Sequence, residues 1–594
     1  MKTDPITGEM IYKARGTCNG GKRYGKAVTL AETYATCVAQ PACRVYWSIT
    51  TSEGLLAFGA DAGNAFAEAP PPVEPFYMRI DVQFIEWWVE SEKNDPIPDD
   101  YVLPVQHALQ GHPEAPRLWE IHIHTILMVH LKFVPTTHEK CLYHKRDDKG
   151  NLIMLLRQVN DFAVSAMEAA TCSAVIREIG THLQVPLNDL VGLIKKFNGV
   201  NILQSRHFIK VSCEDYLHKI LATHSWTDLK ASNQPIPMRS DTVYQRQLES
   251  APRPQQDQEQ QLIQNQAGFS YRMATGELIY ALVSARPEIS FATTKLTQYG
   301  TNPALIHYQA AKTVFAYLNN TIEDGLVYWR RNPRMDLPEH TLPCPRSNTQ
   351  DFLPTPRQQP TTPLVYADSD WGSDTTHRRS VSGLIIMLAG AAVVYKTHYQ
   401  RAVALSGTEA EFVAASDAGK MDLYVRSLLH DLGFTQHHPT TMKMDNMGAH
   451  HMVSAGAPTK RTRHVDIRYF ALLQWAESGQ IKTEPIPTAH NVSDSFTKAT
   501  GRIKFHQHAD IFMGRRPPSY VSPHTLTINS MQHGTPSSPA LLKATHHILW
   551  QHLRSLHHLD MEEVSALHHP LLFRALCTFL PMTVQSTGGV KGLQ

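Results

Sequence analysis

Four acidic residues in the second half of the chain are placed so that they could act together: Asp368, Glu411, Asp445 and Asp494. Each is expected on a different strand or helix, and strand ends and helix starts are where an α/β sheet presents functional groups. Converging carboxylates repel one another unless protons or cations lie between them. A pair of Mg²⁺ ions relieves that repulsion and suits phosphodiester hydrolysis, because one ion activates water and the other stabilises the leaving oxygen. Taken singly, each acid is more often a solvated surface group, so the pattern alone does not decide.

The segment around Asp368 has the alternation of a β-strand. In PLVYADSDW, residues 363–371, a period of two places Asp368 and Asp370 on one face. Two apolar runs follow on either side of Gly390, where a hairpin would turn. The three runs together predict a three-stranded meander.

The other three acids are expected on three further elements. A helix opened by the capping box at Ser406 carries Glu411. The short strand TMKMDN, 441–446, has Asp445 at its C-terminal end, and a last strand is followed by a helix that carries Asp494. The acids therefore come from separate elements of one α/β unit.

Composition limits what the rest of the chain can be. The length of 594 residues predicts roughly three or four domains. An apolar content of 42% excludes wholesale disorder, and a net charge of +2 means that any nucleic-acid site must be a local basic track. Eight scattered cysteines without a CxxC pair exclude a zinc ribbon and fit reduced thiols. With no signal peptide and no apolar run long enough for a membrane span, we expect an intracellular protein of the cytoplasm or nucleus without a membrane partner.

Two stretches interrupt the hydrophobic pattern and divide the chain. Residues 241–266 are rich in glutamine and are interpreted as a linker, since such a segment cannot bury a core. Residues 331–362 are rich in proline and are interpreted as a second linker. The remaining expected pieces are residues 1–240, 267–330 and 363–514, followed by a His-rich, poorly ordered tail over 515–594.

The piece 363–514 resembles the RNase H domain of copia-type LTR retrotransposons. The matching strings, in the family's order and spacing, are YADSDWGSD, HRRSVSG, VALSGTEAEFVAAS, MDN, TKRTRHVDIRYF and VSDSFTKA. The metal-binding, catalytic acids that the resemblance implies are Asp368, Glu411, Asp445 and Asp494. Glu409 is a rival to Glu411 because both lie in the TEAE string, and the family pattern favours the second.

Basic residues precede the expected helix DIRYFALLQWAE. Lys460, Arg461 and Arg463 form a cluster that fits either a solvated face or phosphate contacts, and within this domain we favour contact with an RNA–DNA hybrid. His490 comes just before the last acid and is a candidate for assisting product release, with a plain loop histidine as the alternative.

The region 13–240 resembles the reverse transcriptase of the same elements. The matching strings include KAR, AETYATCV, FGADAGNAFAEA, HALQGHPEAPRLW, EKCLYHKRDDKGNLIMLLRQVNDFAV and EDYLHKILATHSW. The region after the Gln-rich segment also matches, where the family connects polymerase to RNase H. The resemblance implies an α/β and α+β multidomain chain: a right-hand polymerase-like palm and thumb, then an RNase H-like mixed β-sheet flanked by helices. Only twelve residues precede Lys13, so we expect truncated fingers.

The expected polymerase centre lacks one acid. Polymerases hold two Mg²⁺ between acids on neighbouring palm strands. Asp61 matches the first acid of the family, but the Tyr-X-Asp-Asp hairpin reads Gln158-Val159-Asn160-Asp161. Asn160 replaces the principal metal ligand, and a neutral amide offers one acceptor oxygen and no charge, so metal affinity should fall. Asp61 and Asp161 remain as the implied catalytic and metal-binding acids, and we expect weak or absent polymerase activity.

The resemblance thus implies a retrotransposon-derived RNA-directed DNA polymerase and RNase H fragment whose ribonuclease centre is complete. Its expected partners are an RNA–DNA hybrid and an RNA template with a DNA primer, and its expected cofactor is Mg²⁺, two ions per centre, with Mn²⁺ as a substitute. The alternative is a non-catalytic nucleic-acid-binding remnant or a pseudogene product, which would bind hybrid without metal and cut nothing. The sequence does not indicate the oligomeric state.

Overall fold

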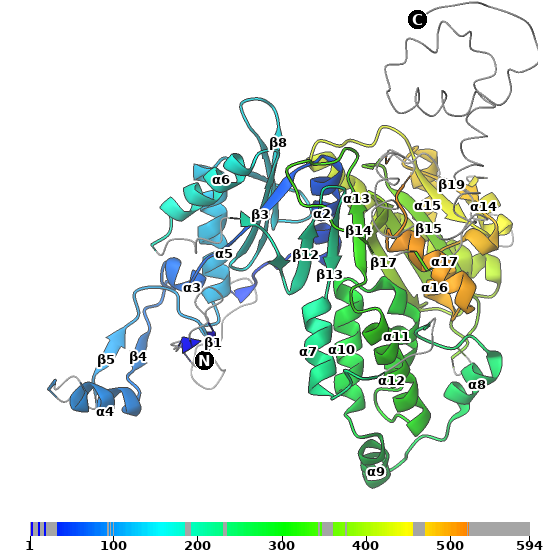
Figure 1. Cartoon of the computed structure of the whole chain (residues 1–594), viewed down its shortest axis with the longest axis horizontal. Coiled ribbons are helices and arrows are strands. Elements are labelled where there is room, and N and C mark those ends of the chain that lie inside the picture. Colours follow the sequence, from blue (N-terminus) through cyan, green and yellow to red (C-terminus); the bar gives the residue numbers. More distant parts are fainter. Residues whose placement is uncertain are drawn as a thin grey trace, which may run out of the picture. The chain divides into compact units, whose positions relative to one another are not determined.

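A computed structural model describes most of the chain (Figure 1). The described residues are 33–91, 100–184, 192–229, 235–342, 360–374, 377–454 and 470–518, with the short pieces 2–3, 10–11, 17–18, 94–95, 97–98, 345–346 and 521. They belong to one compact unit, Met1–Thr525. The tail beyond residue 521 and the basic cluster at Lys460, Arg461 and Arg463 lie outside the described residues.

A six-stranded antiparallel sheet carries the expected polymerase acids, with strand order β10-β3-β9-β8-β7-β6. Its strands are β3 (Leu56–Asp61), β6 (Val134–Pro135), β7 (Leu142–Arg146), β8 (Leu152–Gln158), β9 (Asp161–Ala166) and β10 (Gly192–Leu193). The helices of this region are α2 (Gln40–Ser52), α3 (Ala65–Glu68), α5 (Ala115–Thr125), which continues into η1 (Ile126–His130), and α6 (Ala169–Thr181). In β8, Met154 and Leu156 point into one apolar core while Ile153 and Leu155 point into another. The apolar run of β8 is therefore a strand buried on both faces.

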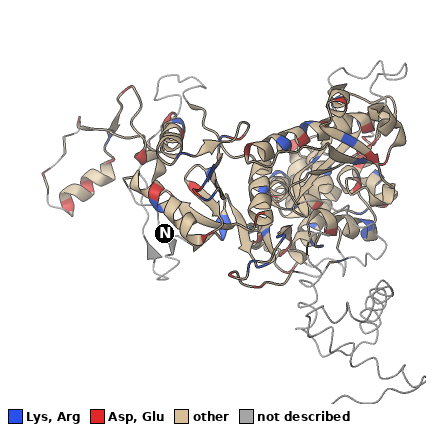
Figure 2. Cartoon of the chain, turned by 90° about the horizontal axis from the view of Figure 1, so that it is seen from above, with Lys and Arg blue, Asp and Glu red and all other residues tan. Residues whose placement is uncertain are grey.

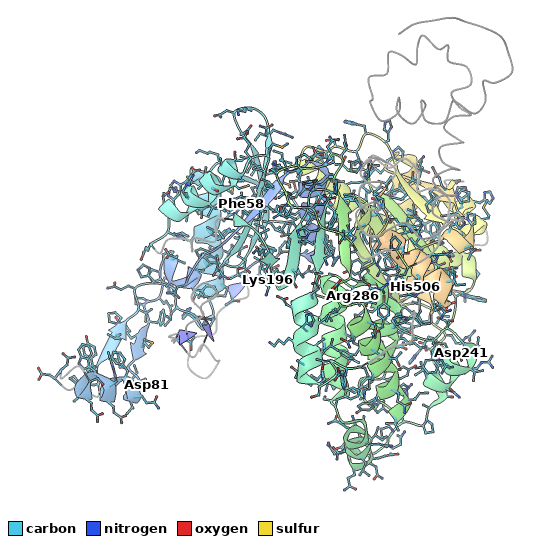
Figure 3. The ribbon with its side chains drawn as sticks, viewed as in Figure 1. Phe58, Asp81, Lys196, Asp241, Arg286 and His506 are labelled. Atoms are coloured by element: carbon cyan, nitrogen blue, oxygen red, sulfur yellow. The ribbon has the colours of Figure 1, made fainter. Side chains whose placement is uncertain are left out.

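A hairpin of β4 (Tyr77–Arg79) and β5 (Val102–Pro104) encloses the helix α4 (Val82–Glu90). Asp81, labelled in Figure 3, caps this helix by accepting a hydrogen bond from the backbone N–H of Gln83 at 2.9 Å. None of the residues of α4 is buried. Two further short strands, β1 (Lys2–Thr3) and β2 (Met10–Ile11), pair with each other.

A four-stranded antiparallel sheet, β11-β12-β13-β14, leads into a helical part. Its strands are β11 (Lys196–Phe197), β12 (Val200–Gln204), β13 (Phe208–Ser212) and β14 (Gly325–Trp329). The helices between β13 and β14 are α7 (Glu214–Thr223), α8 (Thr242–Ser250), α9 (Asp257–Ala267), α10 (Tyr271–Ser284), η2 (Pro287–Ile289), α11 (Ser290–Thr297) and α12 (Leu305–Asn320). Apolar side chains from α7, α10, α11 and α12 form one core.

The Gln-rich segment differs from its expected form, because most of it is helical. It contains α8 and α9, and Leu248 on α8 is fully buried. The backbone carbonyl of Leu248 accepts a hydrogen bond from Nε2 of the buried His307 at 2.8 Å. Glutamine has good helix propensity, and Tyr244, Leu248 and Ile263 pack these helices against the core of the helical part.

The third sheet is mixed and has the order β17-β16-β15-β18-β19. Its strands are β15 (Leu364–Asp370), β16 (Val381–Leu388), β17 (Ala391–Tyr399), β18 (Thr440–Met444) and β19 (Ile481–Pro485). The first three are antiparallel and turn at Gly390, whose φ is +90°, so the predicted meander is confirmed. Both β18 and β19 run parallel to β15. The accompanying helices are α13 (Gly407–Asp431), α14 (Met447–Ser454), α15 (Ala471–Glu477), η4 (Thr488–His490), α16 (Asp494–Thr497) and α17 (Arg502–Phe512).

One apolar core joins the first and third sheets. Val45 and Trp47 of α2 belong to the same buried cluster as Val393 of β17. Arg44, also on α2, is buried and donates to the carbonyl oxygens of Val393 at 3.2 Å and Val283 at 2.7 Å. The pieces that were expected as separate domains therefore share their interior within this unit.

Buried ion pairs add to this junction. Arg515, just after α17, pairs with Asp324 at 2.6 Å and with Asp510 at 3.0 Å. Arg286, labelled in Figure 3, pairs with Glu288 at 2.5 Å, and both side chains are fully buried. Removal of one partner would leave an uncompensated buried charge. The Arg515–Asp324 pair connects the segment after α17 to the turn between α12 and β14, whereas Arg286 and Glu288 both belong to the helical part.

Charges of both signs are interspersed along the described ribbon (Figure 2). None of the described helices has the length and apolar character required to cross a membrane.

Candidate metal centre

Three of the four predicted acids of the third sheet form one group. Since β15 and β18 are parallel, their C-terminal ends lie at the same edge of the sheet. Asp368 lies near the end of β15, Asp445 directly follows β18, and Glu411 comes from the second turn of α13, which packs on β15. One carboxylate oxygen from each of the three lies within 4.8 Å of the other two.

The fourth acid, Asp494, is buried beside this group and is paired with lysines. Lys498 Nζ lies 2.9 Å from Asp494 Oδ1 and 3.9 Å from Asp368 Oδ2, so it bridges the two acids. Lys504 donates a hydrogen bond to Asp494 Oδ2. Burial alone would raise the pKa of Asp494, but Lys498 and Lys504 outweigh it and the pKa lies below its ordinary value. Asp494 therefore remains charged without a metal.

In the grouped carboxyls, burial and the neighbouring acids outweigh such compensation, although Lys498 lowers the pKa of Asp368 somewhat. Burial raises the pKa of Glu411, and the neighbouring Asp368 and Asp445 raise it further. Burial and then Asp494 raise the pKa of Asp368. Glu411 Oε1 accepts a hydrogen bond from the backbone N–H of Ser369 at 3.1 Å, whereas its Oε2 is buried without a hydrogen-bond partner. A buried, unpaired carboxylate oxygen facing two further acids fits a divalent cation.

Neighbouring polar side chains orient the acids. The Asn491 amide, fully buried, donates to Ala367 O at 3.1 Å and to Asp445 Oδ1 at 3.3 Å. The Thr497 hydroxyl donates to Asp368 Oδ2. Sequence reasoning did not single out Asn491, Thr497, Lys498 or Lys504, although the first three lie within or beside the VSDSFTKA string.

A hydrogen bond from β17 supports the short helix α16. Thr397 Oγ1 donates to the carbonyl oxygen of Phe496 at 2.7 Å and accepts from Ser290 Oγ at 2.9 Å. Ser290 begins α11 of the helical part. A chain of two hydrogen bonds therefore connects α11 to the helix that carries Asp494.

Glu409, the rival of Glu411, has another contact. Its Oε2 accepts from the backbone N–H of Leu405 at 2.8 Å, and its own N–H donates to the capping Ser406 at 3.2 Å. Glu409 thus closes the start of α13, and of the two glutamates it is Glu411 that lies in the group of three close carboxylates. His490 ends the short helix η4, and its role in product release stays a prediction.

The expected polymerase acids meet at a hairpin. Asp61 ends β3 and lies directly opposite Asp161, the first residue of β9. Gln158 pairs with Asp161, so Val159 and Asn160 form a two-residue turn, with φ of +53° at Val159. The predicted hairpin is confirmed. Gln158 Oε1 accepts from the backbone N–H of Val38 at 2.9 Å, which ties this turn to the chain before α2.

The Asn160 amide contacts the first of these acids. Its Nδ2 donates a hydrogen bond to Asp61 Oδ1. Burial and then Asp61 raise the pKa of Asp161. Within the described part of the chain, the only group of at least three close metal-ligating side chains is the one around Glu411. The palm residues therefore do not reproduce the three-carboxylate set that a polymerase metal pair requires.

Comparison with known proteins shows what the chain is similar to. Residues 2–238 match the family model described as reverse transcriptase (RNA-dependent DNA polymerase). The chain is 25% identical over 507 residues to the retrovirus-related Pol polyprotein from transposon TNT 1-94 of Nicotiana tabacum, covering 85% of this chain and 34% of the polyprotein. It is 24% identical over 510 residues to the retrovirus-related Pol polyprotein from transposon RE2 of Arabidopsis thaliana, covering 86% of this chain and 31% of that polyprotein. Among solved structures, LC11-RNase H1, isolated from compost, matches with 14% identity and a TM-score of 0.19, covering 23% of this chain and 92% of that one.

Residues 2–238 thus match a reverse transcriptase, and over most of its length the chain is similar to part of the pol polyproteins of copia-type retrotransposons. It spans about a third of the length of the curated relatives it matches, 34% and 31% in the two cases above. The expected mixed α/β class and the reverse transcriptase match of residues 2–238 are confirmed.

Proposed function

We propose that the third sheet is a metal-dependent ribonuclease that cuts the RNA strand of RNA–DNA hybrids, and that the palm has lost most or all of its polymerase activity. The observation that carries the nuclease proposal is the group of Asp368, Glu411 and Asp445 with its unpaired Glu411 oxygen. Two Mg²⁺ ions bound there, with Mn²⁺ as a substitute, would activate the attacking water and stabilise the leaving oxygen.

The chain's own residues prepare this centre. Asn491 holds Asp445, and the Ser369 N–H holds one oxygen of Glu411 so that the other faces the group. Lys498 and Lys504 neutralise Asp494, which keeps its charge from adding to that of the three ligands. Asp494 in this arrangement supports the centre through Lys498, which reaches both Asp494 and Asp368.

The test uses the purified full-length chain and a labelled RNA–DNA hybrid with Mg²⁺ or EDTA. We expect cleavage of the RNA strand with Mg²⁺ only, and its loss in Asp445→Asn. A thermal melt gives an independent readout, because Mg²⁺ should stabilise the wild-type chain and not Asp445→Asn. A folded wild-type chain that binds hybrid but neither cuts it nor responds to Mg²⁺ would support the alternative of a non-catalytic remnant.

The polymerase proposal depends on Asn160. With the amide bonded to Asp61, only Asp61 and Asp161 offer charged ligands at the palm hairpin. Extension of a DNA primer on an RNA template should therefore be weak or undetectable in the wild-type chain. Primer extension at a rate typical of reverse transcriptases would contradict this proposal.

A further inference from the structure

Three neighbouring strand ends meet at the edge of the sheet where the acids lie. Trp371 directly follows β15. Arg379 precedes β16 and Arg401 follows β17, and these two strand ends are paired by the Gln400 N–H, which donates to Ser380 O at 2.8 Å. This edge is the one at which β15 carries Asp368, because Asp370 pairs with Val381.

The side chains at this edge are exposed. Trp371 is 53% exposed, and the nearby Leu405 is 69% exposed. Arg378, Arg379 and Arg401 are also exposed, and none of the three forms an ion pair with a described carboxylate. A large aromatic ring and several uncompensated cations on one surface are typical of a binding site.

The surface is also held in place. Trp371 Nε1 donates to the carbonyl oxygen of Ala404 at 3.0 Å, which fixes the indole while leaving it exposed. The Asp374 N–H donates to Arg379 O at 3.1 Å, and the Arg378 N–H donates to Asp374 O at 2.7 Å. These hydrogen bonds fix the positions of Trp371, Arg378 and Arg379, which lowers the cost of ordering them when a ligand binds.

We infer that Trp371, Arg378, Arg379 and Arg401, here called the Trp371 surface, bind the sugar–phosphate backbone of the RNA–DNA hybrid beside the acids. This inference rests on the proposed function, since it names the surface that presents the hybrid to that centre. Buried carboxylates repel phosphates, so a nucleic acid reaching them needs cations at the flank. Arginine guanidinium groups match phosphate geometry, and an indole ring packs against a sugar or a base.

The test measures hybrid binding without cleavage, by fluorescence anisotropy of a labelled hybrid with the full-length chain in EDTA. Trp371→Ala should weaken binding by about tenfold. The double variant Arg379→Gln/Arg401→Gln should lower the slope of log affinity against log salt by roughly one for each arginine removed. The matched controls are Arg246→Gln, Arg272→Gln and Leu262→Ala, which change exposed residues of the helical part and should bind hybrid like the wild-type chain.

The outcomes separate this inference from the proposed function. If the wild-type chain cuts hybrid and the Trp371-surface variants bind it as tightly and with the same salt slope, the inference is wrong and the nuclease proposal stands. If Trp371→Ala leaves hybrid binding unchanged but abolishes self-association in sedimentation, the surface is a protein interface and the inference is again wrong. A wild-type chain that binds no hybrid overturns both.

Discussion

Replacing Asn160 with aspartate tests the interpretation of the palm as a metal site that has lost a ligand. In the wild-type chain the amide donates to Asp61, and a hydrogen bond to a charged acceptor contributes about 1.5–3 kcal/mol. Asn160→Asp removes that bond and places a third carboxyl against Asp61 and Asp161. Two unit charges about 4 Å apart repel by about 4 kcal/mol at an effective dielectric constant of about 20, and protonation relieves part of this. We expect a net loss of about 3 kcal/mol in EDTA at neutral pH.

The direction in which this loss of stability changes with pH follows from the raised pKa values of the clustered carboxyls. Burial and Asp61 already raise the pKa of Asp161, and a third carboxyl raises it further. A carboxyl whose pKa is higher in the folded chain binds its proton more tightly there, so folding weakens as the pH rises through that pKa. The loss in Asn160→Asp should therefore be largest at about pH 8 and shrink toward about pH 5.

The assay is thermal unfolding followed by circular dichroism, with EDTA or with excess Mg²⁺. All chains carry Asp445→Asn, so that the metal group of the third sheet does not contribute. Asn160→Asp should melt lower than its parent in EDTA and regain stability with Mg²⁺, while the parent should not respond. Asn332→Asp, which adds the same charge at an exposed position, serves as the control. An Asn160→Asp chain as stable as its parent in EDTA and unresponsive to Mg²⁺ would refute the interpretation.

Three further predictions concern positions outside the metal ligands. Thr397→Val breaks the connection from Ser290 to α16, so the hybrid-cutting rate should fall by about tenfold with binding unchanged; wild-type kinetics would show that α16 needs no such support. Burial lowers the pKa of His307 to about 4, so the neutral ring contributes its full stabilisation above about pH 6.5, and the free energy of unfolding falls by about 2 kcal/mol by about pH 5. Urea unfolding of His307→Gln at both pH values should show a smaller change in this free energy than the wild-type chain. Phe496 is fully buried against Phe512, so Phe496→Ala should destabilise by about 3–5 kcal/mol in a calorimetric melt; a cost below about 1 kcal/mol would contradict this packing.

The elements around the acids follow from local signals in the sequence. The Ser406 cap, the turn at Gly390 and the position of Asp445 after a strand all depend on nearest neighbours, and the structure contains each of them. The partners of the acids were not predictable in this way. Lys498 reaches Asp368 only because α16 and β15 come together in the fold, across 130 residues of sequence, and the packing of Leu248 against His307 is likewise long-range. The family resemblance singled out the four acids, of which three form the close group, but not the lysines that pair with Asp494.

The shared core between α2 and β17 has a consequence for how such a chain can lose activity. Val45 and Trp47 fill the interior beneath Val393 whether or not the palm hairpin holds a metal. Even if the first sheet has lost the proposed polymerase chemistry, α2 still supports the third sheet, so the apolar positions of both sheets are under one folding constraint. Substitutions at the hairpin turn around Asn160 should therefore be tolerated better than substitutions in the strands and helices behind it. If the third sheet were expressed without α2, it would lose the apolar side chains of α2 that cover it, and Val393 and its neighbours would be exposed to solvent.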